Sequence, residues 1–452
     1  MNIGILHYQL GGTDGVSLEV EKWQRVLAEL GHTVHLVAGD LGHATGTQLE
    51  SLYHHSPIAE KLYRNTFDGL TDYPTPAAFR DELYRAADAA ETELRRFIAA
   101  KHIDLLLPQN VWSVAMNPAV AIALARVVRD LGIPTIAHHH DFYWERGRQA
   151  RGVSLTCAPA MELADKFLPP RDSHIRHIVI NSLAQNDLRE RKGINATVVP
   201  NIFDFDAPPW VVDDYNRDFR QRIGVGENDV LILQATRIVP RKGIELAIDF
   251  VSALNARREK LVGHGLFDGR QFSADDRIVL VLAGDAQDDP TGDYVSRLRE
   301  KIARQGVEAR FIGEMVAGDR QLRAGEKVYS LWDTYVFADF VTYPSLWEGW
   351  GNQLLEALRA KLPIMLFEYP VFRADIAPHG FEVVSVGHEI AGHDVHGLAL
   401  VSPAAIEAAA EHALPLLTDV SARQAVVERN FSLGKQFYSM DALRTIIREM
   451  VG

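Results

Sequence analysis

The fold of this chain is decided in residues 340–358, which read FVTYPSLWEGWGNQLLEAL. An apolar run predicts a buried strand, and a helical pattern begins after the glycines Gly349 and Gly351. Glycine lets the backbone approach a ligand closely, and N–H groups at the start of a helix favour an anion. Glu348 lies in the turn, and Glu356 lies eight positions later, about two helical turns along the same side. The stretch therefore indicates a strand–turn–helix unit of an α/β protein with a ligand site at the turn.

Units of the same kind precede and follow this stretch. Short apolar runs alternate with longer amphipathic segments, a pattern that predicts parallel sheets covered by helices on both faces. We expect a first series of strands at Asn2–His7, Thr33–Ala38, Ile103–Pro108, Thr135–His138, His177–Asn181 and Thr197–Pro200. A second series is expected at Val230–Gln234, Ile278–Ala283, Ala309–Ile312, Phe340–Tyr343, Ile364–Phe367 and Glu382–Val386. Helices are expected between them, among others at Val16–Leu30, Ala77–Ala100 and Pro118–Leu131.

The two series of strands predict two domains. The length of 452 residues exceeds what one hydrophobic core usually supports, and Asp204-Phe-Asp-Ala-Pro-Pro between the series is typical of a linker. We expect two Rossmann-like, doubly wound domains at residues 1–205 and 206–434, and a helix at about 435–452 that packs back on the first. Open α/β sheets bind ligands beyond the carboxyl ends of their strands, so the two domains are expected to face an interdomain cleft.

The composition is that of an ordinary globular protein, with 47% hydrophobic and 24% charged residues. A net charge of −13 disfavours nucleic acid and anionic membranes as partners, because phosphate groups need a basic surface. The single cysteine, Cys157, excludes an intramolecular disulfide and a multi-cysteine metal cage. No apolar run approaches the roughly 20 residues that span a bilayer, and the first residues read as a strand and not as a signal peptide. We therefore predict a cytoplasmic protein without a transmembrane segment.

A basic pair lies upstream, in residues 235–243, which read ATRIVPRKG between a strand and a helix. Together with the Glu-x7-Glu pair, Arg237 and Lys242 resemble the donor site of the family 4 retaining glycosyltransferases, a GT-B group that includes sucrose-phosphate synthases and many mannosyltransferases. Glu-Gly-Trp-Gly here replaces the commoner Glu-Gly-Phe-Gly. The resemblance implies that Arg237 and Lys242 stabilise the departing diphosphate, that Glu348 holds hydroxyls of the donor sugar and that Glu356 binds the ribose.

Main-chain groups of the turn complete the donor site that the resemblance implies. In the family these positions offer backbone N–H groups to the nucleotide sugar, so their place matters more than their side chains. The residues concerned here are Gly349, Trp350, Gly351, Asn352, Gln353 and Leu354. Arg241 is adjacent to Lys242 but does not occupy the family position, and we assign it no role. The alternative for the charged residues is a helix cap and solvated surface charge.

Two elements of the first half resemble the same family. Gly11-Gly-Thr-Asp-Gly-Val follows the first strand and is similar to the glycine loop of the family, in which Gly11 and Gly12 would face the donor diphosphate and the acceptor. The segment Ala137-His-His-His-Asp-Phe-Tyr-Trp-Glu-Arg is similar to the His-Asp element that follows a later strand. This resemblance implies that His140 is a catalytic residue that touches the donor sugar, with Asp141 supporting the loop.

The three consecutive histidines also suggest zinc, because imidazole is a common zinc ligand. Successive residues of a strand point to opposite sides, so His138, His139 and His140 do not easily converge on one ion. Histidines that belong only to the core are a further alternative. We predict no metal here, and we expect the Asp-x-Asp sequence at 204–206 to be structural.

Basic and aromatic residues follow the His-Asp element. Arg146, Arg148 and Arg151 concentrate positive charge in an acidic chain, and guanidinium groups suit carboxylate or phosphate. We expect Arg146 and Arg148, with Asp141 and Tyr143, to bind an anionic acceptor, whereas a solvated loop is the alternative. Tyr143 and its aromatic neighbours would wall the acceptor or else pack beneath the loop.

The motifs occur in family order along nearly the whole chain, and they predict a retaining glycosyltransferase that moves a hexosyl unit from a nucleotide sugar to a hydroxyl acceptor. The His-His-His-Asp-Phe-Tyr-Trp and Glu-Gly-Trp-Gly-Asn-x-Leu-Leu-Glu stretches are similar to enzymes that make mannosylglucosylglycerate-type compatible solutes. That similarity implies GDP-mannose as donor and a glucosylglycerate or phosphoglycerate derivative as acceptor. It also implies no tightly bound cofactor and no metal requirement for the chemistry. The oligomeric state stays open.

Other functions remain as alternatives at this stage. A UDP-glucose-dependent glucosyltransferase would use the same motifs, and so would a sugar-nucleotide epimerase of the same fold. A non-catalytic module that binds a nucleotide sugar is the third alternative. A dinucleotide-dependent dehydrogenase is disfavoured because the first glycine loop lacks Gly-x-Gly-x-x-Gly.

Overall fold

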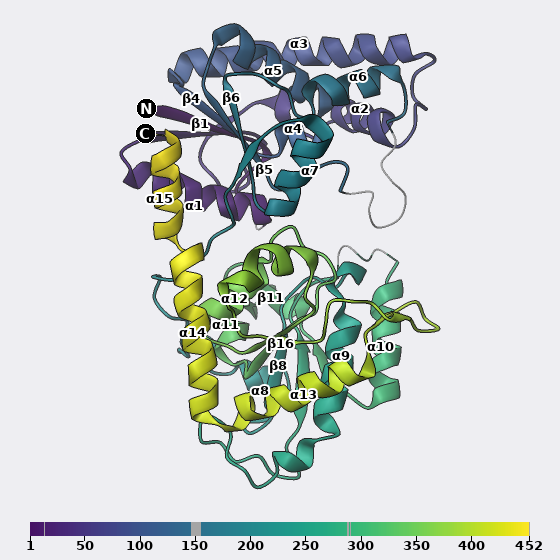
Figure 1. Cartoon of the computed structure of the whole chain (residues 1–452), viewed down its shortest axis with the longest axis vertical. Helices are drawn as coiled ribbons and strands as arrows, with labels where there is room; N and C mark the ends of the chain where they lie inside the picture. The colour runs from purple at the N-terminus through teal and green to yellow at the C-terminus, as the bar shows by residue number, and fades with distance from the viewer. Residues whose placement is uncertain (13, 146–154, 287–288, 290, 452) are drawn as a thin grey trace. The chain divides into compact units, whose positions relative to one another are not determined.

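The chain folds into two compact units, each built on a parallel sheet, so the α/β fold class predicted from the sequence is confirmed. The computed structural model describes residues 1–12, 14–145, 155–286, 289 and 291–451 (Figure 1). The first unit comprises Met1–Ile202 with Met440–Gly452, and the second comprises Phe203–Ser439. In the described part of the chain, no helix combines the length and the apolar character needed to cross a membrane.

The chain passes between the units after Ile202 and again after Ser439, a few residues from the boundaries expected at 205 and 434. Aromatic packing explains the first difference, because the rings of Phe203 and Phe205 meet Trp332 and Phe431 of the second unit edge to face. The second crossing follows the end of a continuous helix, α14 (Val420–Tyr438), which packs against its neighbours in the second unit.

The first unit contains a seven-stranded parallel sheet in the order β3-β2-β1-β4-β5-β6-β7. Its strands are β1 (Asn2–Gln9), β2 (Thr33–Asp40), β3 (Thr47–Gln48), β4 (Leu105–Pro108), β5 (Thr135–His139), β6 (Ile175–Val179) and β7 (Ala196–Val198). Its helices are η1 (Glu50–Leu52), α1 (Gly15–Glu29), α2 (Pro57–Phe67), α3 (Pro76–Lys101), α4 (Val111–Val114), α5 (Pro118–Leu131), α6 (Ala158–Phe167), α7 (Ser182–Lys192) and α15 (Met440–Val451).

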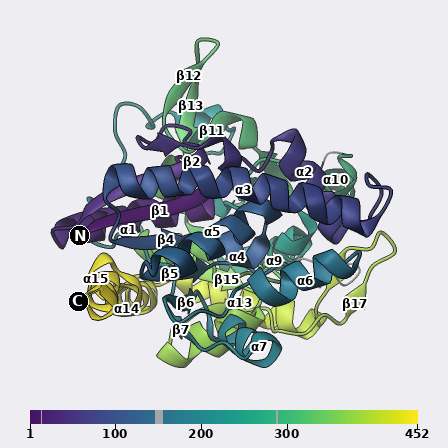
Figure 2. The same cartoon turned by 90° about the horizontal axis from the view of Figure 1, so that it is seen from above.

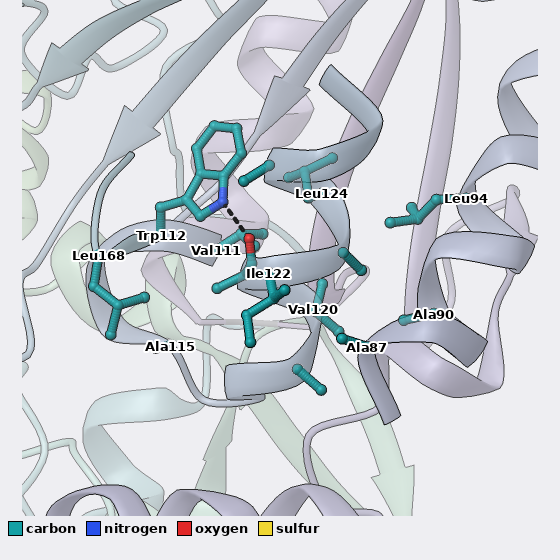
Figure 3. Packing of buried hydrophobic residues seen from close by; sticks show 14 of the residues in the cluster. Ala87, Ala90, Leu94, Val111, Trp112, Ala115, Val120, Ile122, Leu124 and Leu168 are labelled. Atoms are coloured by element: carbon teal, nitrogen blue, oxygen red, sulfur yellow. Dashed lines mark hydrogen bonds between the residues drawn. The ribbon is translucent and has the colours of Figure 1, made fainter. Parts of the chain in front are cut away.

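Helices cover both faces of this sheet. One apolar core joins the strands to α2, α3, α5 and α6, and a second joins the opposite face to α1 and α15. α3 and α5 lie side by side over the first face, as Figure 2 shows from above. In the core beneath them, the buried Trp112 donates a hydrogen bond from Nε1 to the carbonyl oxygen of Ala121, at 2.9 Å (Figure 3). The indole N–H is thus satisfied although the ring is buried among aliphatic side chains.

Local sequence sets the ends of the central helix of this unit. α5 begins at Pro118. Proline has no backbone N–H, and the first residue of a helix needs none, since its N–H would have no partner within the helix. The helix ends at Leu131, and Gly132 follows with φ 62°. Nearly every residue between them is buried, which suits the apolar sequence of a helix packed between α3 and the sheet. The helix therefore matches the expected range Pro118–Leu131.

The second unit contains a six-stranded parallel sheet in the order β10-β9-β8-β14-β15-β16. The strands of the sheet are β8 (Val230–Gln234), β9 (Ile278–Leu282), β10 (Glu308–Phe311), β14 (Phe340–Tyr343), β15 (Ile364–Leu366) and β16 (Val384–Ser385). Its α-helices are α8 (Phe219–Arg222), α9 (Ile244–Asn255), α10 (Asp293–Gln305), α11 (Leu331–Val336), α12 (Asn352–Arg359), α13 (Pro403–Thr418) and α14. Shorter turns are η2 (Pro240–Lys242), η3 (Arg258–Lys260), η4 (Gly313–Met315), η5 (Phe372–Ile376, a π-helix) and η6 (Ala377–His379).

All twelve expected strands form, with ends that shift by up to two residues, but two small sheets were not predicted. One is three-stranded, with β11 (Val316–Ala317), β12 (Gln321–Arg323) and β13 (Glu326–Ser330). The other pairs β17 (Gly392–His393) with β18 (Ala399–Leu400). Sequence periodicity misses them because strands of two to five residues are too short to show an apolar repeat.

Candidate functional site

A buried ion cluster lies at the carboxyl ends of β8 and β14 in the second unit. Glu348 is only 8% exposed, and its Oε1 accepts a hydrogen bond from the ammonium group of Lys242. Its Oε2 accepts a second one from Nη1 of Arg241 at 3.0 Å. The ammonium nitrogen of Lys242 also lies 5.6 Å from the ring centroid of Tyr343. One carboxylate is therefore held by two cations from a neighbouring loop.

The charges of this cluster determine its protonation. Burial opposes ionisation of Glu348, but the neighbouring Lys242 and Arg241 outweigh it and lower the pKa of the carboxyl group to about 2. Burial also lowers the pKa of the Lys242 ammonium, and the carboxylate of Glu348 acts against that change. The pKa of the Tyr343 hydroxyl is raised by burial and by the charge of Glu348. Glu348 is therefore an anion throughout the neutral range.

Two glycines hold the loops of this cluster against each other. Gly243 follows Lys242 with φ 58°, and a Cβ there would lie 2.3 Å from the carbonyl oxygen of Pro344. The backbone N–H of Leu346 donates to the carbonyl oxygen of Arg241 at 2.9 Å, which ties the same loops together. Gly351 directly precedes α12 and has φ 128°, and a Cβ there would lie 2.1 Å from the hydroxyl oxygen of Tyr369. Side chains at these positions would push the charged groups apart.

Arg237 lies in the same loop as Lys242 but is exposed. Its charge is close enough to Lys242 to oppose protonation of that ammonium group. The loop is packed tightly against the turn after β9, since a Cβ at Gly284 would lie 1.8 Å from the carbonyl oxygen of Thr236. Three cations, Arg237, Arg241 and Lys242, thus share one short loop at the carboxyl edge of the sheet.

Glu356 is held by a different group from those that bind Glu348. It lies on α12, and its Oε2 accepts a hydrogen bond from the hydroxyl of Tyr335 on α11 at 2.6 Å. Tyr335 is buried, and burial together with the charge of Glu356 raises the pKa of its hydroxyl well above 10. The hydroxyl therefore stays protonated and fixes the direction of the carboxylate.

The other residues expected around the donor differ in how far their side chains are buried. The Trp350 ring is buried and meets Tyr438 edge to face at 5.2 Å, while its carbonyl oxygen accepts a hydrogen bond from Tyr369. The side chains of Gln353 and Leu354 are also buried within the second unit. Leu354 therefore offers a ligand only its main chain, whereas Nε1 of Trp350 and Oε1 of Gln353 are buried polar atoms without a hydrogen-bond partner among the described residues. Gly349 and Asn352, the latter the first residue of α12, are half-buried.

The glycine loop of the first unit lies between β1 and α1. Gly11 has φ 69°, and a Cβ there would lie 2.3 Å from the carbonyl oxygen of Leu41, so only glycine fits. Gly12 carries no such constraint on φ, although a Cβ would lie 3.1 Å from Oδ2 of Asp14. Asp14 caps α1 by accepting hydrogen bonds from the N–H groups of Val16 and Ser17, each at 3.1 Å. A carboxylate therefore occupies the helix start where the sequence suggested a diphosphate.

His140 directly follows β5 and lies in a buried, neutral environment. Its Nε2 lies 2.9 Å from Oε1 of Gln109, and its backbone N–H donates to Oδ1 of Asn110 at 2.7 Å. Burial, the main cause, and the nearby His7 lower the pKa of the His140 ring to about 3, although the charge of Asp14 acts in the opposite direction. The ring is therefore an uncharged hydrogen-bonding group at neutral pH.

The other two histidines of the triplet point to separate partners. The ring of His138 lies between Trp23 and His140, with centroid distances of 5.1 and 4.1 Å. His139 points to the opposite face, where its Nε2 lies 3.0 Å from Nδ1 of His177. Among the residues that the structure describes, no group of three or more His, Cys, Asp or Glu is placed to hold a metal ion.

The expected acceptor residues are only partly within the described chain. The backbone N–H of Asp141 donates to Oδ1 of Asn110 at 3.3 Å, and that of Tyr143 donates to the carbonyl oxygen of Ser113 at 2.7 Å. The Tyr143 ring is half-buried and lies 5.4 Å from the ring of Phe67. Arg146, Arg148 and Arg151, for which an anionic acceptor was expected, lie outside the described residues.

Sequence reasoning missed several residues that organise these sites. Arg241 received no role, yet it binds the carboxylate of Glu348. Asn110 has φ 56°, and its Oδ1 accepts the backbone N–H groups of both His140 and Asp141. An Asn directly after a strand in Pro-Gln-Asn was the available signal, since asparagine tolerates this backbone conformation. Asp204 accepts the N–H groups of Asp206 and Ala207, so its carboxylate closes a turn.

Comparison with known proteins shows which family the chain belongs to. Residues 216–432 match the family described as glycosyl transferases group 1. A protein named mannosylglucosylglycerate synthase from Petrotoga mobilis is 38% identical over 444 residues, which cover 98% of this chain and 100% of that protein. A protein of the same name from Thermotoga maritima is 37% identical over 453 residues, which cover 100% of both chains.

Solved structures resemble the whole chain as well. Sucrose-phosphate synthase from Thermosynechococcus elongatus superposes with a TM-score of 0.61 at 14% identity, covering 100% of this chain and 98% of that one. HepE from Anabaena, in complex with UDP and glucose, gives a TM-score of 0.59 at 16% identity, covering 99% and 98%. At such identities the likeness concerns the fold, which is GT-B as expected. Because it is also more than 30% identical over its full length to two synthases, the chain belongs to the group 1 glycosyltransferases and is a glycosyltransferase.

Proposed function

We propose that this glycosyltransferase moves a mannosyl unit from GDP-mannose to glucosylglycerate, with retention of configuration at the anomeric carbon. The observation that carries the proposal is the cluster of Lys242, Arg241 and Glu348, which brings two cations and an ionised carboxylate together at the carboxyl edge of a parallel sheet. The names of the two full-length relatives support the choice of sugar and acceptor.

In this proposal the cations bind the donor diphosphate. An ammonium group has three N–H donors, so Lys242 can keep its hydrogen bond to Glu348 and still donate to phosphate oxygens. Arg237, exposed in the same loop, adds a second charge. Both would stabilise the negative charge that builds up on the diphosphate as the bond to the sugar breaks. This use of side-chain charge is the reason why we propose chemistry that does not require a metal ion.

The carboxylates would hold the donor's hydroxyl groups. Glu348 would accept hydrogen bonds from the sugar, and its charge is secured by Arg241 and Lys242. Glu356, oriented by Tyr335, would bind the ribose. Gly349, Gly351 and the start of α12 would bring main-chain N–H groups to the phosphates, together with Trp350, Asn352, Gln353 and Leu354.

The first unit would supply the groups that meet the sugar and the acceptor. His140, uncharged at neutral pH, would hydrogen-bond a hydroxyl of the sugar. Gly11 and Gly12 would let the acceptor and the diphosphate come close to the main chain. Asp141, Tyr143, Arg146 and Arg148 would contact the acceptor, whose carboxylate suits guanidinium groups. We also propose that the protein acts in the cytoplasm, where nucleotide sugars are made.

A ligand panel tests the donor. Thermal unfolding would be followed with GDP-mannose, UDP-glucose and an ADP-sugar, because a ligand that binds only the folded state raises the midpoint in proportion to its affinity. We expect GDP-mannose to give the largest rise and, with glucosylglycerate, a disaccharide product whose anomeric configuration NMR identifies. A larger rise with UDP-glucose, inversion of configuration, or an epimerised sugar formed without acceptor would each contradict the proposal.

A further inference from the structure

A glutamine side chain lies beside His140 at the carboxyl edge of the first sheet. Gln109 directly follows β4, where its backbone pairs with His138 and its N–H donates to the carbonyl oxygen of Leu6 at 2.8 Å. β4 lies between β1 and β5 in the sheet, so Gln109 stands between His7 and His140. It is 1% exposed, and its position is therefore fixed by the sheet itself.

The backbone and the side chain of Gln109 each form a hydrogen bond to a different histidine. Its backbone carbonyl oxygen lies 2.7 Å from Nδ1 of His7, and its side-chain Oε1 lies 2.9 Å from Nε2 of His140. Both imidazoles are neutral at pH 7, because burial lowers the pKa of each ring. In the orientation that the Gln109 amide has here, Oε1 faces the ring and can only accept, which puts the proton of His140 on Nε2 and the lone pair on Nδ1. Gln109 thereby selects one of the two tautomers of His140.

The main chain around His140 is fixed as well. Oδ1 of Asn110 accepts the N–H groups of His140 and Asp141 and also the hydroxyl of Ser113, at 2.7, 3.3 and 3.1 Å. The ring of His138 packs on that of His140, with 4.1 Å between centroids. The position of the imidazole is thus fixed by its neighbours. Which of its two nitrogens carries the proton depends on Gln109.

The amide nitrogen of Gln109 has no hydrogen-bond partner among the residues that the structure describes. Leaving a buried amide N–H₂ unsatisfied costs free energy, so such a group calls for an explanation. It carries two donors and lies beside the histidine at the edge of the sheet where ligands of α/β proteins bind. An oxygen atom of a ligand would satisfy it.

We propose that Gln109 is a positioning residue that sets the tautomer of His140 through Oε1 and that also donates a hydrogen bond from Nε2 to a hydroxyl oxygen of the bound carbohydrate. The proposal rests on the proposed function, because it takes the ligand to be a sugar. Both the donor sugar and the acceptor carry such hydroxyl groups, and the kinetics below distinguish them.

Two substitutions separate the two parts of the proposal. Gln109→Leu removes acceptor and donor together. Gln109→Glu keeps an oxygen that accepts from Nε2 of His140 and removes the amide donor, and its carboxylate also favours protonation of Nδ1. Asn117→Leu is a matched control, since Asn117 is also a buried amide of the first unit and bonds to the carbonyl oxygen of Ser51, away from the histidines. Thermal unfolding of each variant shows that it is folded.

The tautomer is read by ¹H–¹⁵N NMR of protein labelled with [¹⁵N]histidine, with the His140 signals assigned by His140→Asn. We expect a protonated Nε2 in the unaltered protein, in Gln109→Glu and in Asn117→Leu, and a loss of this preference in Gln109→Leu. Unchanged His140 signals in Gln109→Leu would overturn the positioning role. This measurement needs no substrate, so it decides the point even if the chain does not use GDP-mannose.

The ligand contact is read by steady-state kinetics. Both Gln109 variants should raise KM about threefold to tenfold for one substrate, the loss expected for one hydrogen bond. A rise for the nucleotide sugar assigns the contact to the donor, and a rise for glucosylglycerate assigns it to the acceptor. Equal KM values in both variants and in the unaltered protein would overturn the contact. If no transfer is observed with any nucleotide sugar, the proposed function fails instead, while the NMR result stands.

Discussion

The candidate sites of the two units have opposite character. In the first unit His140, Gln109 and Asn110 are neutral groups joined by hydrogen bonds. In the second unit Arg241, Lys242 and Glu348 are charged. Burial lowers the pKa of the first unit's imidazole to about 3, whereas neighbouring cations lower that of the second unit's carboxyl group to about 2. The buried imidazole is neutral because no close partner compensates for the cost of burying its charge. The buried carboxylate keeps its charge because two cations lie beside it.

Under the proposed function, the two candidate sites would have different tasks. A diphosphate needs cations, and a chain with a net charge of −13 provides them in one loop of the second unit. A sugar hydroxyl needs only neutral donors and acceptors, which the first unit offers. The predictions below test whether charge matters in one unit and hydrogen-bond geometry in the other.

The largest effect is expected from Lys242→Met. Without the ammonium group the leaving diphosphate loses a stabilising charge, and kcat should fall by about two to three orders of magnitude, roughly 3–4 kcal/mol of barrier. Steady-state turnover at saturating donor measures it.

Lys301→Met is the control, because Lys301 is also buried in the second unit and pairs with Asp249 at 2.8 Å, outside the candidate site. It should change thermal stability and leave kcat within about twofold. Equal losses of kcat in the two variants would show that any buried lysine of this unit matters and would remove Lys242 from the mechanism.

Acid should destabilise the first unit before the second. The folded pKa values of His140 and His177, about 3 and about 4, lie below the ordinary 6.5, so the unfolded chain binds more protons between these values. Stability present above pH 6.5 is therefore lost as the pH falls, by about 2 kcal/mol per histidine between pH 7 and 5. Glu348 has a lowered pKa, and its contribution, present above about 4.5, is lost only as the pH falls towards 2. Amide hydrogen exchange at pH 7 and 5 measures each unit separately.

His177→Phe should reduce this acid sensitivity, because it removes one of the buried imidazoles that must take up a proton on unfolding. His174→Gln, which replaces an exposed histidine of the same unit, is the control. If protection against exchange, relative to the unfolded chain at the same pH, falls equally in both units at pH 5, the buried imidazoles are not the cause.

A smaller effect is expected from Tyr335→Phe. The change removes the hydroxyl that orients Glu356, at a cost of about 1 kcal/mol for one hydrogen bond, and KM for the nucleotide sugar should rise about fivefold with little change in kcat. Tyr329→Phe removes a hydroxyl that bonds to Asp218 in the same unit and should leave KM unaltered. A fall in kcat without a change in KM would contradict a role of Glu356 in ground-state ribose binding.

The smallest effect is expected from Trp350→Phe. The Trp350 ring packs against Tyr438, and its hydrogen-bonded carbonyl group remains in the variant. Donor KM and kcat should stay within about twofold, whereas thermal stability falls by about 1–2 kcal/mol through lost packing. A large rise in donor KM would show that the indole itself contacts the nucleotide sugar.

The fold and the charged motifs were readable from the sequence because apolar runs and glycine turns follow from local chemistry. The strand Phe340–Tyr343 and the helix Pro118–Leu131 form with the expected ends. The residues that form hydrogen bonds with the motif residues could not be predicted, because they lie far away in the sequence. Arg241 meets Glu348 across more than a hundred residues, and Gln109 meets His140 through sheet order alone. Residues such as Asp14 required the structure, because a capping carboxylate and a ligand-binding loop have the same sequence signature.

The route of the chain has a consequence for biosynthesis. α15 supplies Met440, Leu443 and Ile447 to the core beside α1, and burying each such side chain stabilises the fold by about 1.5–3 kcal/mol (Figure 1). The core beside α1 therefore stays incomplete until residues 440–451 have left the ribosome, although all seven strands of the first sheet are made earlier. A nascent chain that stalls inside the second unit exposes an apolar strip on α1, which is a surface for chaperones to bind.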